Sequence, residues 1–593
     1  MTGKDGMAME NRIYGINGPV ATLPGNTGLS MMEMVLVGEE KLVGEVIGIN
    51  TDHTTIQVYE NTTGLRVGEP VEASGGPLCA LLGPGILDNI FDGIERPLKT
   101  IQEQSGDFIS RGVSVSSLDE ERLWDVTLTV KVGDELSGGA IYATCPETAV
   151  ITHRCMVPPT LSGTITKVNE NGQYRLNDTV AVLTDQNGTE HPLTLCQRWP
   201  IRTPRPVAKR LFAGTPLITG QRVLDTLFPV AKGGTAAIPG GFGTGKTMTQ
   251  HQLAKWCDAD IIVYVGCGER GNEMSQVLEE FSELIDPKSG RPMTDRTVLI
   301  ANTSNMPVAA REASIYTGVT LAEYYRDMGY HVAIMADSTS RWAEALREIS
   351  GRLEEMPAEE GFPAYLPSRL SEFYERACMA ETLNGAEGSV TIIGAVSPQG
   401  SDFSEPVTQN TKRFTRCFWA LDKSLAYARH YPAVNWMNSY SEYLGDLSGW
   451  YKAHVGEEFI TCRTQIAALL QEENRLMEIV KLIGSDVLPD DQKLVIEIAR
   501  LIRVGFLQQN AYHKDDTYVP LTKQLKMMQI ILHLYKEAGR LVASAVPLSR
   551  ITALGLFDRV VRIKYDVPND QLDLLDTYFT DISDALRALE NTI

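Results

Sequence analysis

A glycine-rich octapeptide fits the phosphate-binding pattern G-x-x-x-x-G-K-[ST]; it reads Gly240-Gly241-Phe242-Gly243-Thr244-Gly245-Lys246-Thr247. Glycines permit positive φ, so successive backbone N–H groups can point at phosphate oxygens. Lys246 supplies a point charge for the β- and γ-phosphates, and Thr247 opens a helix where its hydroxyl can reach Mg²⁺. A β-prone stretch precedes the loop and a helix-compatible stretch follows it. The pattern therefore predicts a nucleoside triphosphate site, with a chance match in a glycine-rich turn as the alternative.

Two further segments supply carboxylates at the ends of apolar stretches. Residues 331–337 form an apolar run that ends in Asp337, which would reach the carboxyl edge of a parallel sheet beside Thr247 and Mg²⁺. Glu269 and Arg270 follow the apolar run 261–265. Glu269 could orient a water molecule in line with a γ-phosphoryl group, and Arg270 could meet phosphate charge. The alternative is that these two residues simply pair with each other in a solvated turn.

These residues need a scaffold, and the hydrophobic pattern predicts one in several parts. Short strands, including 34–37 and 55–59, indicate a small N-terminal β-barrel, and a second β-rich block follows from about residue 113 to 200. We take this block as a structural insert rather than a lipoyl or biotinyl carrier, because no lysine occupies a hairpin tip. Continuous apolar runs at 261–265, 297–301, 332–336 and 390–393 are typical of buried parallel strands. Helical stripes such as Ile466, Leu469, Leu470, Met477 and Val480 predict a helical C-terminal part.

The patterns divide the chain into consecutive parts: an N-terminal β-barrel at 1–75, the start of the nucleotide-binding core at 76–112, the inserted β-rich domain at 113–200, the P-loop core at 201–440 and the helical domain at 441–593. Proline-rich residues 199–206 mark the boundary before the core. Three helical stripes in the last range, at 466–480, 494–502 and 525–535, indicate core packing. We expect Asp490 and Asp491 to cap the second of these helices.

The composition and net charge of the chain limit the classes of function that it can have. The chain of 593 residues has 54 basic and 75 acidic residues, and its net charge of −21 opposes binding to nucleic acid backbones. No apolar run approaches the roughly 18 residues that span a bilayer, and residues 1–12 hold no signal core. Nine scattered cysteines form no C-x-x-C pair, which favours reduced thiols over zinc ligands. We expect a cytoplasmic protein, or one held at a membrane through its partners.

The motifs together resemble one family. The P-loop, Gly268-Glu269-Arg270, residues 337–345 (D-S-T-S-R-W-A-E-A), 310–314 (A-R-E-A-S) and 431–435 (Y-P-A-V-N) are similar, end to end, to the catalytic A (alpha) subunit of V/A-type rotary ATPases. The insert distinguishes this pattern from the F-type beta subunit, and the intact P-loop distinguishes it from the V-type B subunit. The resemblance implies a RecA-like core, with an N-terminal barrel, an inserted β-rich domain and a helical C-terminal domain around it.

The resemblance also implies residue roles. Lys246 and Thr247 would hold phosphate and Mg²⁺, Glu269 would be the catalytic carboxylate, and Arg270 would contact the γ-phosphate. Asp337 would be an outer-shell magnesium ligand. The remaining implied positions are Arg341 in the phosphate region and the aromatic residues Tyr431 and Tyr512, which enclose adenine.

Two positions depart from the family. Thr244 stands where eukaryotic vacuolar relatives have cysteine, so we expect no disulfide control there. Gly241 replaces the more usual Pro or Ala, and we expect only a modest entropic cost.

The implied complex is an A₃B₃ ring around a central shaft, with peripheral stalks and a membrane ion-translocating sector in other subunits. Its substrates would be ATP, or ADP plus phosphate, with Mg²⁺, and it would move H⁺ or Na⁺ on the cytoplasmic face of the cell membrane. The B-type partner would supply an arginine finger in trans. Two rivals are a homohexameric RNA translocase, which the net charge and the insert oppose, and a non-catalytic ring-building subunit, which would not need Glu269.

Overall fold

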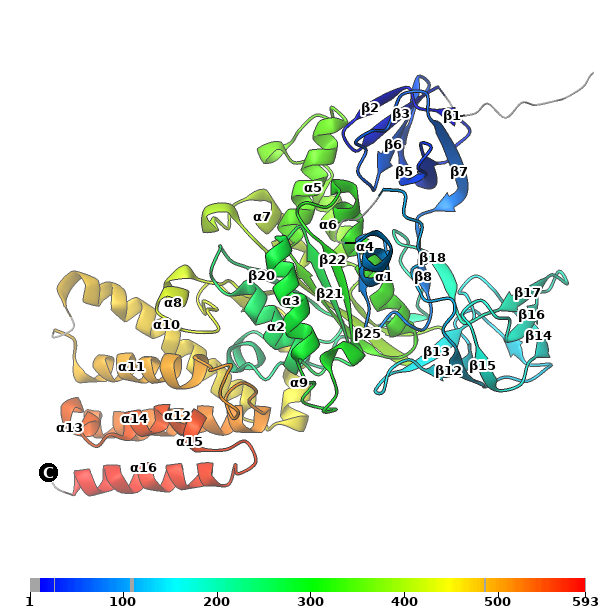
Figure 1. Ribbon diagram of the computed structural model, residues 1–593. Helices are drawn as coiled ribbons and strands as arrows, with labels where there is room; N and C mark the ends of the chain where they lie inside the picture. The colour runs from blue at the N-terminus through cyan, green and yellow to red at the C-terminus, as the bar shows by residue number, and fades with distance from the viewer. Residues whose placement is uncertain (1–10, 26, 107–110, 485–486, 592–593) are drawn as a thin grey trace, which may run out of the picture. The chain divides into compact units, whose positions relative to one another are not determined.

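The computed structural model describes residues 11–25, 27–106, 111–484 and 487–591 (Figure 1). Of the segment 1–12, in which we expect no signal core, residues 1–10 lie outside the described part. The chain divides into two compact units. Unit 1 comprises Met1–Phe212, Ala259–Pro398 and Asp402–Phe414, and unit 2 comprises Ala213–Asp258, Gln399–Ser401 and Thr415–Ile593.

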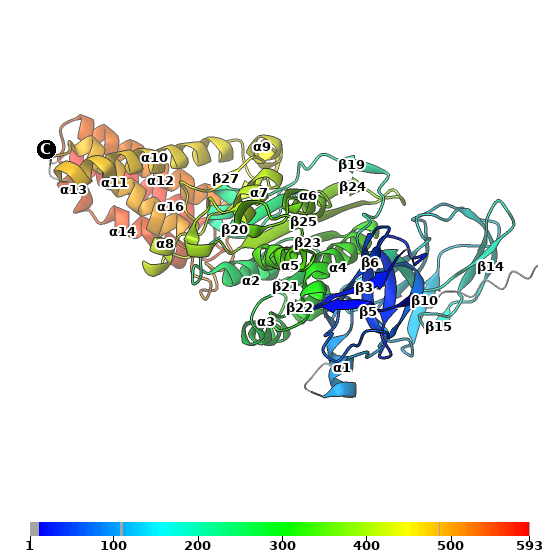
Figure 2. The ribbon, with the colours of Figure 1, turned by 90° about the horizontal axis from the view of Figure 1, so that it is seen from above.

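Unit 1 begins with an antiparallel sheet that curls on itself (Figure 2). Its strands, in the order in which they pair, are β1 (Asn11–Arg12), β7 (Pro70–Pro77), β4 (Glu33–Val37), β5 (Leu42–Ile49), β6 (His53–Val58), β3 (Val20–Pro24) and β2 (Gly15–Asn17). Val35 and Val37 on β4 are buried, whereas Met34 and Leu36 between them are only half-buried. This alternation is the period of a strand with one face in a core. Strands β4 and β6 confirm the two strands predicted at 34–37 and 55–59.

The β-rich block consists of two small antiparallel sheets. One orders β13 (Thr152–Met156), β12 (Ile141–Pro146), β10 (Trp124–Leu128) and β15 (Gly172–Tyr174). The other orders β11 (Glu135–Leu136), β14 (Gly163–Val168), β16 (Ala181–Thr184) and β17 (Glu190–Leu193). A separate antiparallel pair, β8 (Cys79–Leu82) with β18 (Gln197–Pro200), brackets the block in sequence.

The α/β part of unit 1 is built on parallel strands. They pair in the order β25 (Glu387–Val396), β23 (His331–Asp337), β21 (Ile261–Cys267), β22 (Thr297–Asn302) and β9 (Ile90–Phe91). Two antiparallel strands, β24 (Cys378–Glu381) and β19 (Lys209–Leu211), extend it beyond β25. Every residue of β21 and β22 is buried, which explains the unbroken apolar runs in the sequence. The helices of this part are α1 (Leu98–Ser105), α3 (Gly271–Glu283), α4 (Val308–Asp327), α5 (Thr339–Arg352), α6 (Leu366–Tyr374) and α7 (Pro406–Phe414).

Helix α4 is buried along almost its whole length, from Ala309 to Asp327. Its charged side chains near the C-terminal end are paired, as burial of charge requires. Glu323 accepts hydrogen bonds from Arg376 (Nη2, 2.6 Å) and from the backbone N–H of Arg205 (3.0 Å). Asp327 accepts one from Arg205 Nε (2.6 Å). These pairs connect α4 to Arg205, which precedes it in the chain, and to Arg376, which follows it.

Unit 2 contains β20 (Thr235–Pro239), which runs parallel to β26 (Cys417–Phe418), and β27 (Tyr440–Ser441), which is antiparallel to β26. Its helices and helical turns are α2 (Lys246–Trp256), α8 (Lys423–Tyr427), α9 (Leu444–His454), α10 (Phe459–Ile483), α11 (Asp490–Leu501), α12 (Leu521–Ala543), α13 (Leu548–Thr552), α14 (Leu556–Val561), α15 (Ile563–Asp566) and α16 (Leu574–Glu590), with π-helical turns at Val223–Leu227 and Ile502–Leu507. Within the described residues, none of the helices is long and apolar enough to cross a membrane.

The C-terminal stripes fold into helices as predicted, with two local differences. In α10 the buried side chain near the helix end is Leu476, whereas Met477 is 36% exposed, because the buried stripe continues from Leu470 through Glu473 to Leu476. Asp490 and Asp491 lie in the first turn of α11, after Pro489, and not at the cap position. Two carboxylates in a first turn still favour the helix through its dipole.

The ion pair between Glu323 and Arg376 generates a stability prediction. Burial alone would raise the pKa of Glu323, but Arg376 overrides burial and holds that pKa below its usual value. The pair therefore stabilises the fold above the ordinary pKa of a glutamate, and this contribution is lost as pH falls through the lowered folded-state value. We expect Glu323→Gln to destabilise the protein by about 3–5 kcal/mol, because it leaves a buried guanidinium without its counter-charge.

Thermal unfolding at neutral pH measures this effect. The matched control is Glu478→Gln, because Glu478 pairs with Lys481 at 2.7 Å with both side chains 65% exposed. Exposed pairs contribute about 0–1 kcal/mol, so the control should unfold like the parent. Equal thermal unfolding midpoints for Glu323→Gln and Glu478→Gln would contradict a stabilising role for the buried Glu323–Arg376 pair.

Candidate functional site

The glycine-rich loop lies between β20 and α2, as predicted. Gly243 and Gly245 have positive φ values of 78° and 90°, a conformation that side chains with a Cβ rarely adopt. Gly240 is required for a different reason. A Cβ there would lie 2.5 Å from Thr244 Oγ1 and 2.8 Å from Leu421 Cβ. The loop therefore depends on its glycines for both conformation and space.

Internal hydrogen bonds fix the loop. Lys246 Nζ donates to the carbonyl of Gly240 (2.7 Å), and Thr244 Oγ1 donates to the carbonyl of Gly241 (2.8 Å). Lys246 and Thr247 are the first two residues of α2, so both lie at the positive end of the helix dipole. Phe242 is 82% exposed at the loop tip.

Gly241 differs from our expectation of a merely entropic effect. A Cβ on this residue would lie 2.1 Å from Ser401 Oγ and 2.8 Å from Lys423 Cε. These neighbours come from segments about 160 and 180 residues away in the sequence, so the motif itself does not reveal them. A side chain at this position would have to displace the Ser401 hydroxyl and the Lys423 side chain, so its cost includes packing as well as entropy.

A cavity of about 450 Å³ opens beside the start of α2. Its lining residues are Gln221, Gly245, Met248, Thr249, Gln252, Arg429, Tyr431, Pro432, Gln508, Gln509, Asn510, Ala511, Tyr512 and Tyr565. Tyr431 and Tyr512, which the sequence predicts at the base, both line it, and they are 45% and 89% exposed. A cavity of this size with accessible aromatic faces, next to a phosphate loop, has the dimensions and chemistry of a nucleotide base pocket.

Buried cations hold one wall of this cavity, and the sequence analysis missed them. Arg222 is fully buried and donates to the carbonyl of Gln508 (2.8 Å) and to Asp516 Oδ1 (2.5 Å). Lys564 Nζ donates to the carbonyls of Val504 (2.6 Å) and Gln508 (3.1 Å). Burial, and then the nearby Arg222 charge, lower the pKa of Lys564 to about 8. No local sequence motif predicts these contacts, because Arg222 and its partners lie up to about 290 residues apart in the chain.

Unit 1 carries the predicted carboxylates. Asp337 is the last residue of β23, and its neighbour across the parallel pair is Gly266 on β21, three residues before Glu269. Asp337 is 2% exposed and accepts a hydrogen bond from Tyr264 Oη (3.2 Å). Adjacent parallel strands thus bring the two carboxylates to the same sheet edge.

The electrostatics of Glu269 follow from this placement. Its pKa is raised from 4.5 to about 7, first by burial, then by the negative charge of Asp337, and also by Glu273, while Arg341 opposes the shift. A carboxyl group with a pKa near neutrality can exchange its proton at physiological pH, which is the property of a general base.

The two predicted arginines lie around this edge. Arg341, on α5, pairs with Glu344 at 2.9 Å and is half-buried. Its Cβ lies 2.7 Å from the ideal Cβ position of Gly268, so the Arg341 stem packs directly on the turn that carries Glu269. Arg270 is two-thirds exposed, 4.0 Å from Glu273. Glu269, Asp337 and Arg341 are therefore brought together within unit 1, and the loop with Tyr431 and Tyr512 within unit 2.

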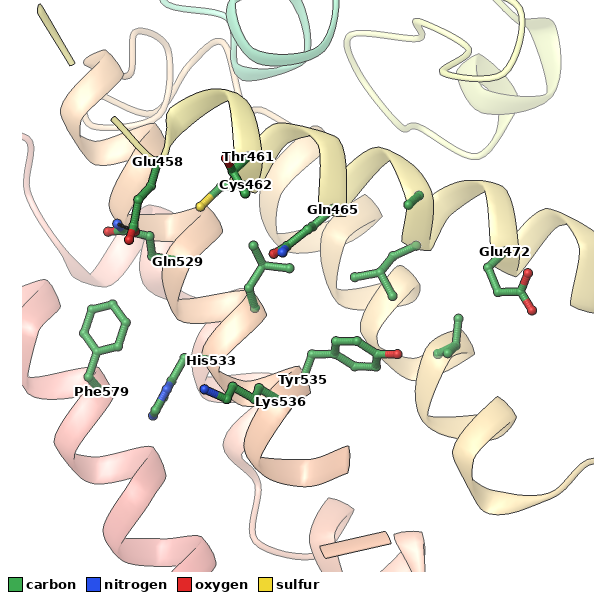
Figure 3. A pocket seen from close by; sticks show the side chains of 14 residues that line it. Glu458, Thr461, Cys462, Gln465, Glu472, Gln529, His533, Tyr535, Lys536 and Phe579 are labelled. Carbon is green, nitrogen blue, oxygen red and sulfur yellow. Dashed lines mark hydrogen bonds between the residues drawn. The ribbon is translucent and has the colours of Figure 1, made fainter. Parts of the chain in front are cut away.

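A larger cavity of about 1020 Å³ lies among the C-terminal helices (Figure 3). Gln465 of α10 and Lys536 of α12 face each other across it, and Glu458, the N-cap of α10, lies toward the same end as Phe579 of α16. Its lining residues include no glycine, and the N-terminus of α10 among them carries the carboxylate of Glu458 at its cap position, which is unfavourable for a triphosphate. In the described residues no cluster of three or more His, Cys, Asp or Glu side chains could hold a metal ion by itself.

Comparison with known proteins decides the family. Family models match four ranges: the ATP synthase alpha/beta family β-barrel domain at 13–75, the ATP synthase alpha/beta subunit barrel-sandwich domain at 115–202, the ATP synthase alpha/beta family nucleotide-binding domain at 220–441 and the C-terminal domain of V and A type ATP synthase at 448–552. The chain is 61% identical over 560 residues to a V-type ATP synthase alpha chain 2 from Clostridium tetani, covering 94% of each chain. It is 56% identical over 566 residues to the corresponding chain of an A-type ATP synthase from Methanopyrus kandleri, covering 95% of each.

This chain belongs to the V- and A-type ATP synthase alpha (A) subunits. A solved type III secretion ATPase, EscN from enteropathogenic E. coli, matches with a TM-score of 0.62 at 20% identity, covering 88% of this chain and 100% of that one. This likeness supports the fold alone. The predicted fold class is confirmed: an N-terminal β-barrel, an inserted β-rich domain, a RecA-like P-loop core and a helical C-terminal domain.

Membership of the family also confirms the predicted function at the level of the subunit. The chain is a nucleotide-binding, catalytic subunit of a V/A-type rotary ATPase, an enzyme that couples ATP chemistry to ion transport, and it works within an ATP synthase complex. The alternative of an RNA translocase is thereby wrong.

The packing around Gly240 generates a prediction about ATP binding by this subunit. We expect Gly240→Ala to weaken ATP binding by more than about tenfold, or about 1.4 kcal/mol, because the new methyl group displaces Thr244 and opens the loop. Equilibrium titration with a fluorescent ATP analogue measures the loss. Gly351→Ala is the control, since nothing lies within 4 Å of a Cβ there. Wild-type affinity in Gly240→Ala would show that the loop accepts a side chain at this position.

Proposed function

We propose that this subunit hydrolyses or synthesises Mg-ATP through Glu269, at sites shared with a B-type subunit. The observation that supports the proposal best is the environment of Glu269, whose pKa is raised to about 7 by burial and by Asp337. A ring-building subunit without catalysis has no need for a carboxylate at this position. In this proposal the glycine loop and the Tyr431–Tyr512 cavity of unit 2 bind the nucleotide, and residues at the ends of β21 and β23 in unit 1 carry out the chemical step.

We assign the binding roles as follows. The backbone N–H groups of residues 240–247 and the ammonium group of Lys246 hold the triphosphate. Tyr431 and Tyr512 enclose the adenine. Thr247 and, through its outer shell, Asp337 hold Mg²⁺; when bound, the ion neutralises charge on the transferred phosphoryl group. The residues fit such an ion, because a cation would relieve the repulsion that raises the pKa of Glu269.

The reaction then depends on Glu269. In its ionised form Glu269 accepts a hydrogen bond from a water molecule and orients it in line with the γ-phosphorus. Water adds to phosphorus as the bond to the ADP oxygen breaks, and Arg270 and Arg341 meet the negative charge on the transferred group. An arginine from the B-type subunit completes the site in trans. The reverse reaction joins ADP and phosphate and releases water.

The assembly that we propose is an A₃B₃ ring with a central shaft and peripheral stalks. Other subunits would form the membrane sector for H⁺ or Na⁺, with this chain held on the cytoplasmic face of the membrane. We keep the predicted domain limits, 1–75, 76–112, 113–200, 201–440 and 441–593, as part of the proposal. The family models begin and end within a few residues of several of these limits, which supports them.

The replacement Glu269→Gln tests the proposal. We expect it to keep Mg-ATP binding and ring assembly but to lower turnover by at least about 100-fold, because the amide cannot accept a proton from water. ATP hydrolysis is measured for the purified chain alone, with a B-type partner, and with the variant. Activity that needs the partner and vanishes in Glu269→Gln supports a shared site. Turnover near the parent level in the variant would refute the role of Glu269, and full activity without the partner would refute the shared site.

The raised pKa of Glu269 predicts the pH dependence of hydrolysis. Because the ionised form is the active one, lowering the pH through about 7 protonates Glu269, so kcat/KM should fall by about tenfold per pH unit below that value. The profile of kcat/KM against pH, recorded with the assembled complex, tests this. A level profile across neutrality would mean that no group with this pKa controls the reaction.

A further inference from the structure

Arg311, in the A-R-E-A-S segment, has no role in the proposed site, yet it packs against the turn that carries Glu269. It lies in the first turns of α4 and is 9% exposed. Its Cδ lies 3.1 Å from the ideal Cβ position of Gly268, and the stem of Arg341 lies on the same glycine at 2.7 Å. Both arginine stems therefore pack against the same side of Gly268, whose φ of 73° is a conformation that only glycine adopts readily.

A chain of hydrogen bonds connects Arg311 to the backbone of Glu269. Arg311 Nη2 donates to the carbonyl of Ser304 (2.8 Å), and the Ser304 N–H donates to the carbonyl of Glu269 (2.9 Å). The Gly268 N–H donates to the carbonyl of Asn302 (2.7 Å). The loop after β22 is therefore hydrogen-bonded both to the Glu269 turn and to Arg311. The Arg311 guanidinium and the backbone of Glu269 are connected through Ser304.

The remaining contacts of Arg311 do not explain its burial. Its backbone carbonyl accepts a weak hydrogen bond from Cys267 Sγ (3.5 Å). Its Nε is buried without a hydrogen-bond partner, and no carboxylate lies within ion-pair distance of it among the described residues. A buried guanidinium without a counter-charge is costly. Such a cost persists where surrounding structure or function requires the residue.

We propose that Arg311 is a positioning residue for the catalytic step: through Ser304 it sets the backbone of the Gly268–Glu269 turn and so the aim of the Glu269 carboxylate. The inference rests on the proposed function, because it requires Glu269 to be the catalytic carboxylate that Arg311 positions. Misplacement of a catalytic group by about 1 Å can lower a rate by about 100-fold. The ATP-binding loop belongs to unit 2, so loss of the Arg311 contact should affect the chemical step more than binding.

Three variants in the complex assembled with the B-type partner test the role. Arg311→Met keeps the aliphatic stem on Gly268 but removes the donor to Ser304; we expect kcat to fall by at least about tenfold with KM for ATP changed by less than about threefold. Arg311→Lys can still donate to the Ser304 carbonyl, so its kcat should lie between those of the parent and Arg311→Met. Ser304→Ala is the matched control, because only the backbone of Ser304 takes part and its activity should equal that of the parent.

Ring assembly, Mg-ATP binding and thermal midpoint are measured for each variant, with Glu269→Gln in parallel. Parent-like kcat in Arg311→Met, with Glu269→Gln inactive, would overturn the inference and leave the proposed function intact. Equal losses of kcat, ATP binding and assembly in Arg311→Met, without recovery in Arg311→Lys, would also overturn it, since they indicate a structural role. Full turnover in Glu269→Gln would instead refute the proposed function.

Discussion

The proposed chemistry depends on the environment of Glu269, in which burial acts together with repulsion from Asp337. Parallel pairing of β21 and β23 brings both carboxylates to one edge, where Asp337 is buried and Glu269 is half-buried, so solvent screens their charges less. The pKa of Glu269 rises to about 7 in consequence. Other residues moderate this repulsion: Arg341 opposes it, and Tyr264 donates a hydrogen bond to Asp337. A site that concentrates negative charge in this way is suited to a bound cation.

The loops that carry the chemistry are limited by space as much as by charge. Gly240, Gly241 and Gly268 each leave no room for a Cβ, because side chains from distant segments pack directly against the backbone. Close packing of this kind fixes the positions of loops that would otherwise be mobile. The glycines therefore provide space as well as backbone flexibility. A methyl group at Gly240 or Gly241 would displace a hydroxyl group, and at Gly241 also the side chain of Lys423.

Buried ion pairs connect the α/β part of unit 1 to its surroundings. Arg202 lies between Glu312 of α4 (2.7 Å) and Glu45 of the barrel sheet (3.1 Å), and Tyr59 donates to Glu45 (2.7 Å). Arg311 precedes Glu312 directly, so one turn of α4 faces both this network and the Glu269 turn. Removal of one partner from a buried ion pair destabilises a protein by more than the intact pair stabilises it. The paired charges therefore hold α4 in place.

Local patterns in the sequence were sufficient for most of the fold and for the types of residues at the site. Apolar runs without alternation predicted β21, β22, β23 and β25, because strands buried on both faces are apolar throughout, and short strands between turn signals predicted β4. The phosphate loop was identified from eight consecutive residues. By contrast, the order of strands in the sheets, the exposure of Met477 and the position of Asp490 in the first turn depend on packing between elements, which a local pattern does not contain.

The sequence by itself determined the nucleotide-binding loop, the family and the identities of the candidate carboxylate, arginine and aromatic residues. Only the tertiary structure decided that a side chain at Gly241 would meet Ser401 and Lys423, that Arg222 and Lys564 support the wall beside Tyr512, and that Arg311 contacts the turn of Glu269. It also decided the raised pKa of Glu269. The physical reason is the same in each instance: these properties depend on distances and burial among residues that are far apart along the chain, and a charge or a methyl group acts only on what folding brings within a few ångströms of it.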